Sequence, residues 1–444
     1  MRAVAVTAIA LLAISSPLLA QNTDIEALSG LQFNFGNPGA RSLGMGGAFM
    51  ALADDASAAE ANPAGLTILR KAEISIEGRR TTIGQTFVTG GTYPYVNTTE
   101  FASARNAISF ASAVIPSHGA VVALYYHRSL SFRNRVDVTQ RYDMPIYFVG
   151  PAGPVAREQC ATTPGCQQRQ IYPFSTSADV QMETFGIAAA HQWRTVSVGA
   201  AMRYHRFQEA ADTFRRDVDA PDKPVFVVAQ TNSGRFFGDS TNKAVSFVGG
   251  VKWTPSPRLS LGAVFKQDSS FAAPVSAGSA GGAQTPIATT RFHVPAMAGV
   301  GLAFRPAPAL TVTADAMHVS YSHLTDSFVS VIEYGTSTGG VERVSGYTAK
   351  NVTELHAGLE YFVLTRAPVA IRAGWWHDPA HAIAYRGPVV SPEEVAAHIL
   401  FPGGRDENHF SAGIGVAWPR FQIDAAYDTS RTLKTASVSV IARY

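Results

Sequence analysis

Apolar and polar side chains alternate with a period of two over much of the chain, which is typical of β-strands. The clearest case is residues 421–427, where apolar residues from Phe421 to Tyr427 share one face and Gln422 and Asp424 lie on the other. The same alternation predicts fourteen strands, near residues 72–80, 104–115, 119–128, 181–192, 195–207, 243–254, 258–267, 292–305, 309–322, 350–364, 368–377, 408–418, 420–429 and 433–444.

The connections between these strands fall into two classes. Tight turns lie at residues 115–119, 192–195, 254–258, 305–309, 364–368 and 418–420. Long polar connections lie near residues 81–103, 129–180, 208–242, 268–291, 323–349 and 378–407. Alternating short and long connections with an even number of strands are typical of an outer-membrane β-barrel, which has short periplasmic turns and long outer loops. An exported soluble β-sandwich also has alternating strands, but it needs neither a lipid-facing band nor two classes of loop.

The sequence therefore predicts an all-β protein, a fourteen-stranded antiparallel outer-membrane β-barrel over residues 72–444 with long extracellular loops. The last strand alternates down to the aromatic Tyr444, which is similar to the C-terminal signal that the barrel assembly machinery reads. We expect that machinery as a partner during biogenesis. Aromatic residues such as Trp193, Trp253 and Trp418 lie near strand ends, where interfacial girdles are found, so outer-membrane lipid is a second expected partner.

The first twenty residues are typical of a cleaved secretory signal peptide. Arg2 supplies the positive charge, residues 3–14 are apolar, and Ala20 offers a small residue at the cleavage point. Because the next residue is Gln21 and not cysteine, a lipoprotein anchor is not expected. An integral protein of the bacterial outer membrane is the predicted destination.

The amino-acid composition argues against several other classes of protein. Only 16% of the 444 residues are charged and 46% are apolar, and 36 Lys and Arg against 33 Asp and Glu give a formal charge of +3. This balance does not favour a nucleic-acid partner. The mean hydropathy of +0.05 is too low for a bundle of membrane helices, and no window reaches the roughly 18 apolar residues that such a helix needs.

The two cysteines, Cys160 and Cys166, lie close together in a polar stretch that contains proline and glycine. In an oxidising compartment we expect them to close a small disulfide loop. A metal site is the alternative, but no second pair of cysteine or histidine residues lies nearby.

Residues 21–71 precede the first strand and do not fit the alternation. They are rich in glycine and alanine and end in Asn62-Pro63-Ala64-Gly65. Gly44 to Phe49 lacks the glycine spacing and the strand–turn–helix context of a phosphate-binding loop. Asp54 and Asp55 form a weak metal pair without a third ligand. We predict instead that this segment folds into the barrel lumen as a plug, where small residues let its backbone pack close to the wall.

The segment resembles the N-terminal hatch of the FadL-type family of outer-membrane long-chain fatty acid transporters, which includes toluene and hydrocarbon channels. Asn62-Pro63-Ala64 matches the family's hatch motif, and Ala53 to Ser57 is similar to the approach to it. Further similarity to the family's middle and late strands lies at residues 294–296, 301–306, 310–315, 356–361, 371–375 and 411–415. The resemblance extends over most of the mature chain and agrees with the strand number obtained from alternation.

The resemblance implies passive, outer-membrane transport of long-chain fatty acids or similar hydrophobic molecules through a plugged barrel, with a lateral exit to the bilayer. Keeping each methylene of a long chain out of water contributes roughly 0.8 kcal/mol, so a route that avoids water is favoured. The stretch from Arg41 to Gly47 also resembles barrel subunits of a secretion system. The alternative function is therefore a non-transporting barrel, a secretion-system or adhesin scaffold whose loops bind protein.

Strand parity points several cationic and imidazole side chains into the lumen. The candidates for binding a carboxylate head group are Arg203, Arg372, Lys252, His205 and His356. The competing interpretation is that they pair with inward carboxylates across the lumen, at Asp315, Glu354, Glu360 and Asp424.

The sequence offers no enzyme signature and no cofactor site. There is no Gly-x-Ser-x-Gly pentapeptide at a strand end. The twelve histidines are scattered along the chain, and we expect none of them to form a metal site. We therefore expect neither catalysis nor a bound metal.

Overall fold

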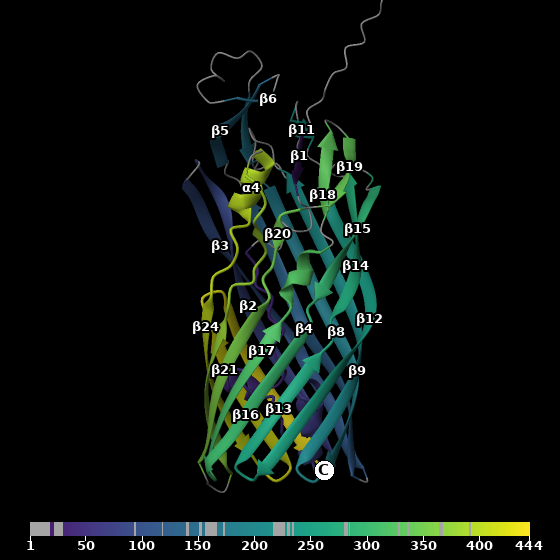
Figure 1. Ribbon diagram of the computed structural model, residues 1–444, viewed down its shortest axis with the longest axis vertical. Coiled ribbons are helices and arrows are strands. Elements are labelled where there is room, and N and C mark those ends of the chain that lie inside the picture. Colours follow the sequence, from purple (N-terminus) through teal and green to yellow (C-terminus); the bar gives the residue numbers. More distant parts are fainter. Residues whose placement is uncertain are drawn as a thin grey trace, which may run out of the picture.

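Fourteen antiparallel strands close into a barrel, which confirms the predicted fold class (Figure 1). The computed structural model describes residues 18–21, 30–92, 95–117, 119–138, 142–150, 153–155, 167–171, 174–215, 227–228, 231–232, 235–278, 283, 285–326, 329–334, 337–343, 345–363, 367–389 and 392–444. The predicted disulfide between Cys160 and Cys166 lies outside the described residues. The barrel closes where the last strand pairs with the first, from Glu73 opposite Arg443 to Ile83 opposite Leu433.

The wall is built from strands of unequal length. They are β2 (Glu73–Thr92), β3 (Tyr95–Ser117), β4 (Ala120–Val138), β8 (Phe174–Trp193), β9 (Val196–Arg215), β12 (Arg235–Ser256), β13 (Leu259–Lys266) continued by β14 (Ser269–Gly278), β15 (Thr285–Val294) continued by β16 (Met297–Ala307), β17 (Leu310–Val319), β21 (Val352–Val363), β22 (Val369–Asp378), β24 (Glu407–Ala417), β25 (Phe421–Thr429) and β26 (Leu433–Arg443).

Shorter elements lie inside the barrel or above it. The helical ones are α1 (Ala40–Gly44), α2 (Ala58–Ala61), η2 (Pro63–Ile68), η3 (Tyr321–Thr325) and α4 (Pro392–Leu400). The short strands are β1 (Leu18–Gln21), β5 (Tyr142–Gly150), β6 (Gly153–Val155), β7 (Gln167–Ile171), β10 (Val227–Val228), β11 (Thr231–Asn232), β18 (Val329–Tyr334), β19 (Ser337–Arg343), β20 (Tyr347–Thr348) and β23 (Ala384–Tyr385). None of the helices in the described part of the chain has the length and apolarity to cross a membrane.

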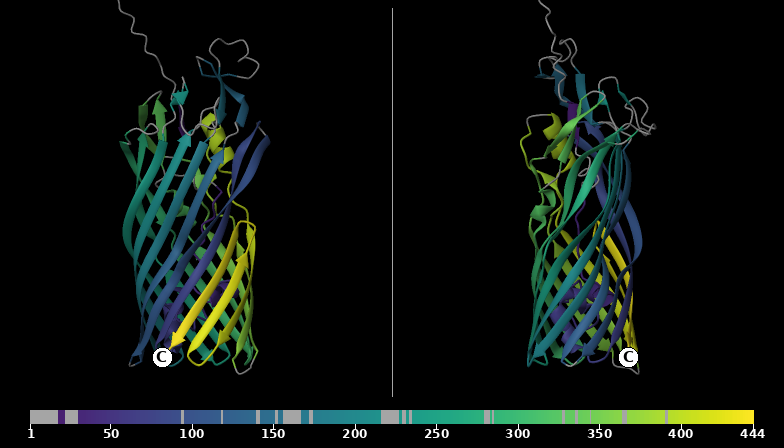
Figure 2. Two further views of the ribbon diagram at one scale, coloured as in Figure 1. Left: turned by 180° about the vertical axis from the view of Figure 1, so that it is seen from behind. Right: turned by 90° about the vertical axis from the view of Figure 1, so that its right-hand side faces the viewer.

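The predicted tight turns are confirmed, but the predicted extents of several strands are wrong. Four stretches expected as long connections, residues 81–103, 129–180, 208–242 and 268–291, contain the upper parts of wall strands. In these upper parts the outward side chains are mostly polar, and apolar side chains such as Phe87, Phe132 and Val136 are buried on the inward face, so the pattern of the lower wall is reversed although the backbone stays extended. One side of the barrel is consequently taller than the side formed by β24, β25 and β26 (Figure 2).

The lower wall carries an outward band of large apolar side chains. Val300, Ile414 and Val438 are each more than half exposed, as expected for side chains that face lipid. Exposed aromatic residues mark the edge nearest the tight turns: Trp193, Trp253, Tyr361, Trp418, Phe421 and Tyr444. Higher on β2 the outward residues become polar, beginning with Arg80, which bonds Asn106 on β3.

Residues 30–70, called here the inner segment, lie within the ring of strands. Nearly every residue from Ala40 to Thr67 is buried, including the side chains of Met45, Phe49 and Leu66. Helix α1 contacts β22, β24, β25 and β26, whereas η2 contacts β8, β9 and β12 on the other side. The start of the mature chain and the exact limits predicted for the signal peptide and hatch stay predictions.

The outward band makes a prediction about stability. Replacing Val300, 60% exposed on β16, by arginine should lower the free energy of unfolding by about 2–4 kcal/mol, because the charge would face hydrocarbon. Asn97→Arg, at an exposed position high on β3, should change it little. Denaturant unfolding in lipid vesicles measures both, and equal stability of the two variants would contradict the assignment of the band.

Candidate functional site

The hatch motif joins the inner segment to the wall. The Asn62 side chain accepts a hydrogen bond from Ala64 N (3.1 Å) and donates one to the Met50 carbonyl (2.8 Å), closing the turn before η2. A Cβ at Gly250 of β12 would lie 2.1 Å from Asn62 Oδ1, and one at Gly199 of β9 would lie 2.4 Å from Ala64 N. Only glycine at these two wall positions admits the motif so closely.

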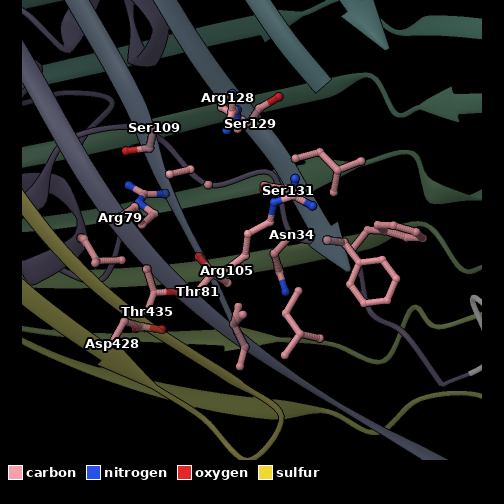
Figure 3. A pocket seen from close by; sticks show the side chains of 18 of the residues that line it. Asn34, Arg79, Thr81, Arg105, Ser109, Arg128, Ser129, Ser131, Asp428 and Thr435 are labelled. Carbon is pink, nitrogen blue, oxygen red and sulfur yellow. The ribbon is translucent and has the colours of Figure 1, made fainter. Parts of the chain in front are cut away.

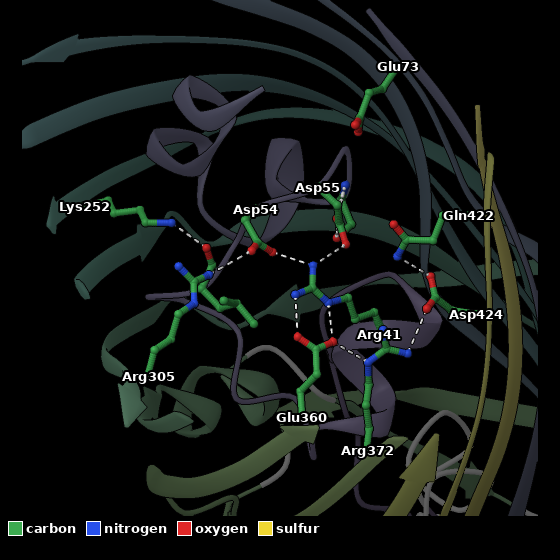
Figure 4. Close-up of polar contacts among 12 residues, drawn as sticks. Arg41, Asp54, Asp55, Glu73, Lys252, Arg305, Glu360, Arg372, Gln422 and Asp424 are labelled. Carbon is green, nitrogen blue, oxygen red and sulfur yellow. Dashed lines mark hydrogen bonds and ion pairs between the residues drawn. The ribbon is translucent and has the colours of Figure 1, made fainter. Parts of the chain in front are cut away.

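A charge cluster holds the other end of the inner segment (Figure 4). Arg41 of α1 forms a bidentate pair with Glu360 of β21, at 2.7 and 2.8 Å, and also bonds Asp54 at 2.6 Å. Glu360 in turn accepts a hydrogen bond from Arg372 of β22 (2.7 Å), whose other donor reaches Asp424 (2.8 Å). Because Arg41, Glu360, Arg372 and Asp424 are buried, each of these charges depends on its partners.

A second cluster surrounds Glu60 of α2. Its carboxylate accepts hydrogen bonds from Tyr125 (2.8 Å), Lys266 (3.1 Å) and Arg203 (3.4 Å), which come from three different strands. Burial alone would raise the pKa of Glu60, but the ammonium of Lys266 and the guanidinium of Arg203 outweigh it and lower the pKa. Glu60 therefore stays ionised, and the inner segment is bound by charge at both ends.

The predicted head-group residues all lie inside the barrel, and each has a protein partner. Arg372 and Arg203 belong to the two clusters above. Lys252 donates to the Leu52 carbonyl, and His356 contacts the Gly46 carbonyl (2.7 Å) and Glu354 (3.3 Å). His205 lies apart from the inner segment, between Thr184 (2.8 Å) and Ser246 (2.7 Å).

The competing interpretation of these residues is seen for three pairs, Arg372–Glu360, Arg372–Asp424 and His356–Glu354. Asp315 instead accepts the backbone N–H groups of Phe49 and Met50, at 2.7 and 2.8 Å. A role for any of these side chains in binding a ligand's carboxylate stays a prediction.

The wall has a seam between β3 and β4. These strands pair only from Phe110 opposite His127 to Ser117 opposite Ala120. Above Phe110, β3 stays paired with β2, and above His127, β4 stays paired with β8, so the ladder between β3 and β4 ends there. Higher up, the Ser103 hydroxyl of β3 still donates a hydrogen bond to the Arg133 carbonyl of β4. A register shift lies beside each strand where the separation begins, and it leaves Ser109 of β3 and Ser129 of β4 as extra residues. Such bulges bend a strand and terminate pairing.

A cavity of about 130 Å³ lies behind the seam (Figure 3). Residues of both seam strands line it, and the floor includes Leu31, Phe33 and Leu43 of the inner segment. The hydroxyls of Ser129 and Ser131 are buried there and have no hydrogen-bond partner among the described residues. Buried hydroxyls without partners are uncommon and mark places where water or a ligand belongs.

The guanidinium groups that line the cavity are already paired with wall carboxylates. Arg79 bonds Glu77 at 2.8 Å and Arg128 bonds Glu183 at 2.7 Å. Arg105 bonds Asp179 across the seam. The cavity is therefore electrically balanced. Among the described residues, no group of three or more His, Cys, Asp or Glu side chains could hold a metal ion.

Sequence reasoning missed Arg41 and Glu60 as the residues that fix the inner segment. A signal for them existed, because residues 41–60 are rich in glycine and alanine and carry only four charges, Arg41, Asp54, Asp55 and Glu60. The seam had no such signal. Ser109 and Ser129 each shift the alternation by one residue. A shift of one residue cannot be distinguished from ordinary irregularity in the pattern.

This architecture defines a class: a fourteen-stranded barrel whose lumen is filled from the N-terminal side. No protein-family model and no curated protein matches the chain. Among solved structures, a Pseudomonas aeruginosa FadL homologue is similar at 15% identity and a TM-score of 0.61, over 94% of this chain and 99% of that one.

Two toluene transporters are also similar. TbuX of Ralstonia pickettii aligns at 14% identity with a TM-score of 0.59, and TodX of P. putida at 13% with a TM-score of 0.58. Both alignments cover 93% of this chain and 99% of the other. The chain therefore has the FadL-type fold.

Breaking the Arg41 cluster should loosen the inner segment. Glu360→Ala leaves two buried guanidinium groups without their shared partner, which should cost about 3 kcal/mol. Hydrogen exchange of residues 40–61 measures the free energy of opening. Lys434→Ala, at an exposed position of β26, is the matched control. Exchange as slow in Glu360→Ala as in the control would contradict a role for this cluster in docking.

Proposed function

We propose that this protein carries long-chain fatty acids or similar hydrophobic molecules inward across the bacterial outer membrane by passive diffusion. The observation that carries the proposal is the cavity behind the seam, where β3 and β4 are no longer paired, next to the buried inner segment. The FadL-type fold supports it, since the similar solved structures include toluene transporters and a monoaromatic hydrocarbon channel.

The seam is the proposed lateral exit. Ile108 lies beside its base on β3, faces outward and is 55% exposed, so the base reaches the apolar band. A molecule that passes from the cavity between β3 and β4 moves directly from protein into lipid. It avoids water at that step, which is worth roughly 0.8 kcal/mol for each methylene kept buried.

The size of the cavity sets what it can hold at one time. A cavity of about 150 Å³ in another protein binds benzene, so about 130 Å³ suits one aromatic ring or part of an acyl chain. A long chain needs further space, which movement of the inner segment would supply. A carboxylate head group would also compete with Glu77, Asp179 or Glu183 for the guanidinium groups, whereas a neutral ligand would not.

Filling the cavity tests the exit. Ala107 lines it from β3, so Ala107→Trp should slow uptake about tenfold, equivalent to about 1.4 kcal/mol of added barrier. The matched control is Ala113→Trp, which faces outward on the same strand and should transport normally. The measurement is the initial uptake of radiolabelled oleate and toluene by a Gram-negative host without hydrophobic channels of its own. Equal uptake by both variants would rule out this exit.

Binding provides an independent test of the proposed function. The purified, refolded barrel should bind labelled oleate or toluene saturably, and removal of residues 21–62 should change that binding, because the inner segment forms the cavity floor. A folded barrel that binds neither compound would overturn the transport proposal and favour a protein partner at the loops.

A further inference from the structure

The barrel wall has a second irregularity, on the short side of the rim. Strand β26 pairs with β2 only as far as Leu433 opposite Ile83, whereas β2 continues to Thr92. The β25–β26 turn therefore ends well below the top of the neighbouring β2–β3 hairpin (Figure 2). The chain from Leu400 to Glu407, which follows α4, lies over the step.

A cleft of about 470 Å³ occupies this step, and it is called here the side cleft. Its lining comes from β2 and β3 on one side and from the 400–407 stretch and the β25–β26 turn on the other: Gly30, Gln32, Thr86, Val88, Thr98, Glu100, Leu400, Pro402, Gly403, Gly404, Arg405, Glu407, Arg431 and Thr432. Thr86, Thr98 and Pro402 are exposed, so the side cleft opens to the outside.

The side cleft lies above the lipid-facing band. Ile76 is the last large apolar residue exposed on β2, and Thr86 lies about ten residues further, or roughly 33 Å along a strand that rises about 3.3 Å per residue. Between them the outward side chains are polar, beginning with Arg80. A molecule in the side cleft therefore arrives from the outer, aqueous side and not from the hydrocarbon core.

One residue joins the side cleft to the cavity behind the seam. Gln32 of the inner segment lines both spaces. Its side chain is held by two long hydrogen bonds, one donated to Asp378 at 3.5 Å and one accepted from His381 N at 3.3 Å. Both lie beyond the usual range of about 2.7–3.2 Å, so little free energy opposes a change of rotamer.

We infer that the side cleft is the outer entrance for the hydrophobic ligand and that Gln32 is the constriction between this entrance and the seam cavity. The inference rests on the proposed transport function. It gives that function a direction: from the short side of the rim, past Gln32, to the opening between β3 and β4. The lining combines threonine, glycine, Val88, Leu400 and Pro402 with four charged residues, Glu100, Arg405, Glu407 and Arg431. Arg431 and Glu407 are paired at 3.6 Å, and the neutral part of the lining suits a small neutral molecule or the apolar end of a longer one.

Blocking the side cleft tests the entrance. The double variant Thr86→Trp/Thr98→Trp should lower the initial uptake of radiolabelled toluene and oleate about tenfold, while equilibrium binding to the purified protein is unchanged because the seam cavity is intact. Asn97→Trp is the matched control. It is equally exposed, and as the neighbour of Thr98 on the same strand its side chain points to the opposite face.

Widening the constriction is the complementary test. Gln32→Ala should raise the uptake rate, and Gln32→Trp should lower it. The inference is overturned if the native protein transports and binds but neither the double variant nor the Gln32 variants change the rate. If the native protein itself neither transports nor binds these probes, the proposed function fails and the entrance fails with it. Heat-modifiable migration in detergent gels identifies variants that do not fold, and the Gln32 variants decide the question if the double variant is one of them.

Discussion

A backbone N–H or C=O group that faces lipid without a partner costs several kcal/mol, and this constraint shapes the whole wall. Closure of β26 on β2 removes the free edges that an open sheet would have. Any place where neighbouring strands separate must therefore be shielded by protein or by a cavity. The seam between β3 and β4 obeys this rule, because it opens at the upper edge of the apolar band and is lined by Arg105, Arg128 and serine hydroxyls. Two bulges let the separation occur without breaking the pairing of either strand with its other neighbour.

Docking of the inner segment follows from a related balance. Its buried side chains, among them Met45, Phe49 and Leu66, form one hydrophobic cluster with residues of the wall, but apolar packing is not directional. Buried ion pairs supply specificity at defined points: Arg41 with Glu360, and Glu60 with Lys266 and Arg203. Such pairs contribute little net free energy when formed but are costly to break singly. Apolar packing therefore retains the segment in the lumen, and the ion pairs fix its position there.

Sequence alone could predict the barrel, because lipid on one side and polar side chains on the other impose a period of two that survives in single strands such as residues 421–427. It could not predict the height of the wall, since above the apolar band the outward face becomes polar while apolar side chains such as Phe87 and Phe101 pack on the inward face, and this reversal of the pattern hides the continuation of the strands. The hatch motif was recognisable because Asn62 and Pro63 are needed for a local turn. The charge clusters were not, because Glu60 and Lys266 are 206 residues apart in the chain and parity gives only the direction of a side chain, not its partner.

The unequal strand lengths connect these features. The C-terminal hairpin ends where β2 and β3 continue, which leaves an opening on one side of the rim. The same tall β2–β3 hairpin forms one side of the seam. The inner segment runs past both openings, with Gln32 at the first and Leu43 at the second. One hairpin therefore separates the two openings, and one segment borders both. A shift of residues 30–36 would change the two openings together, so in the proposed function the inner segment is positioned to couple access from outside to release into lipid.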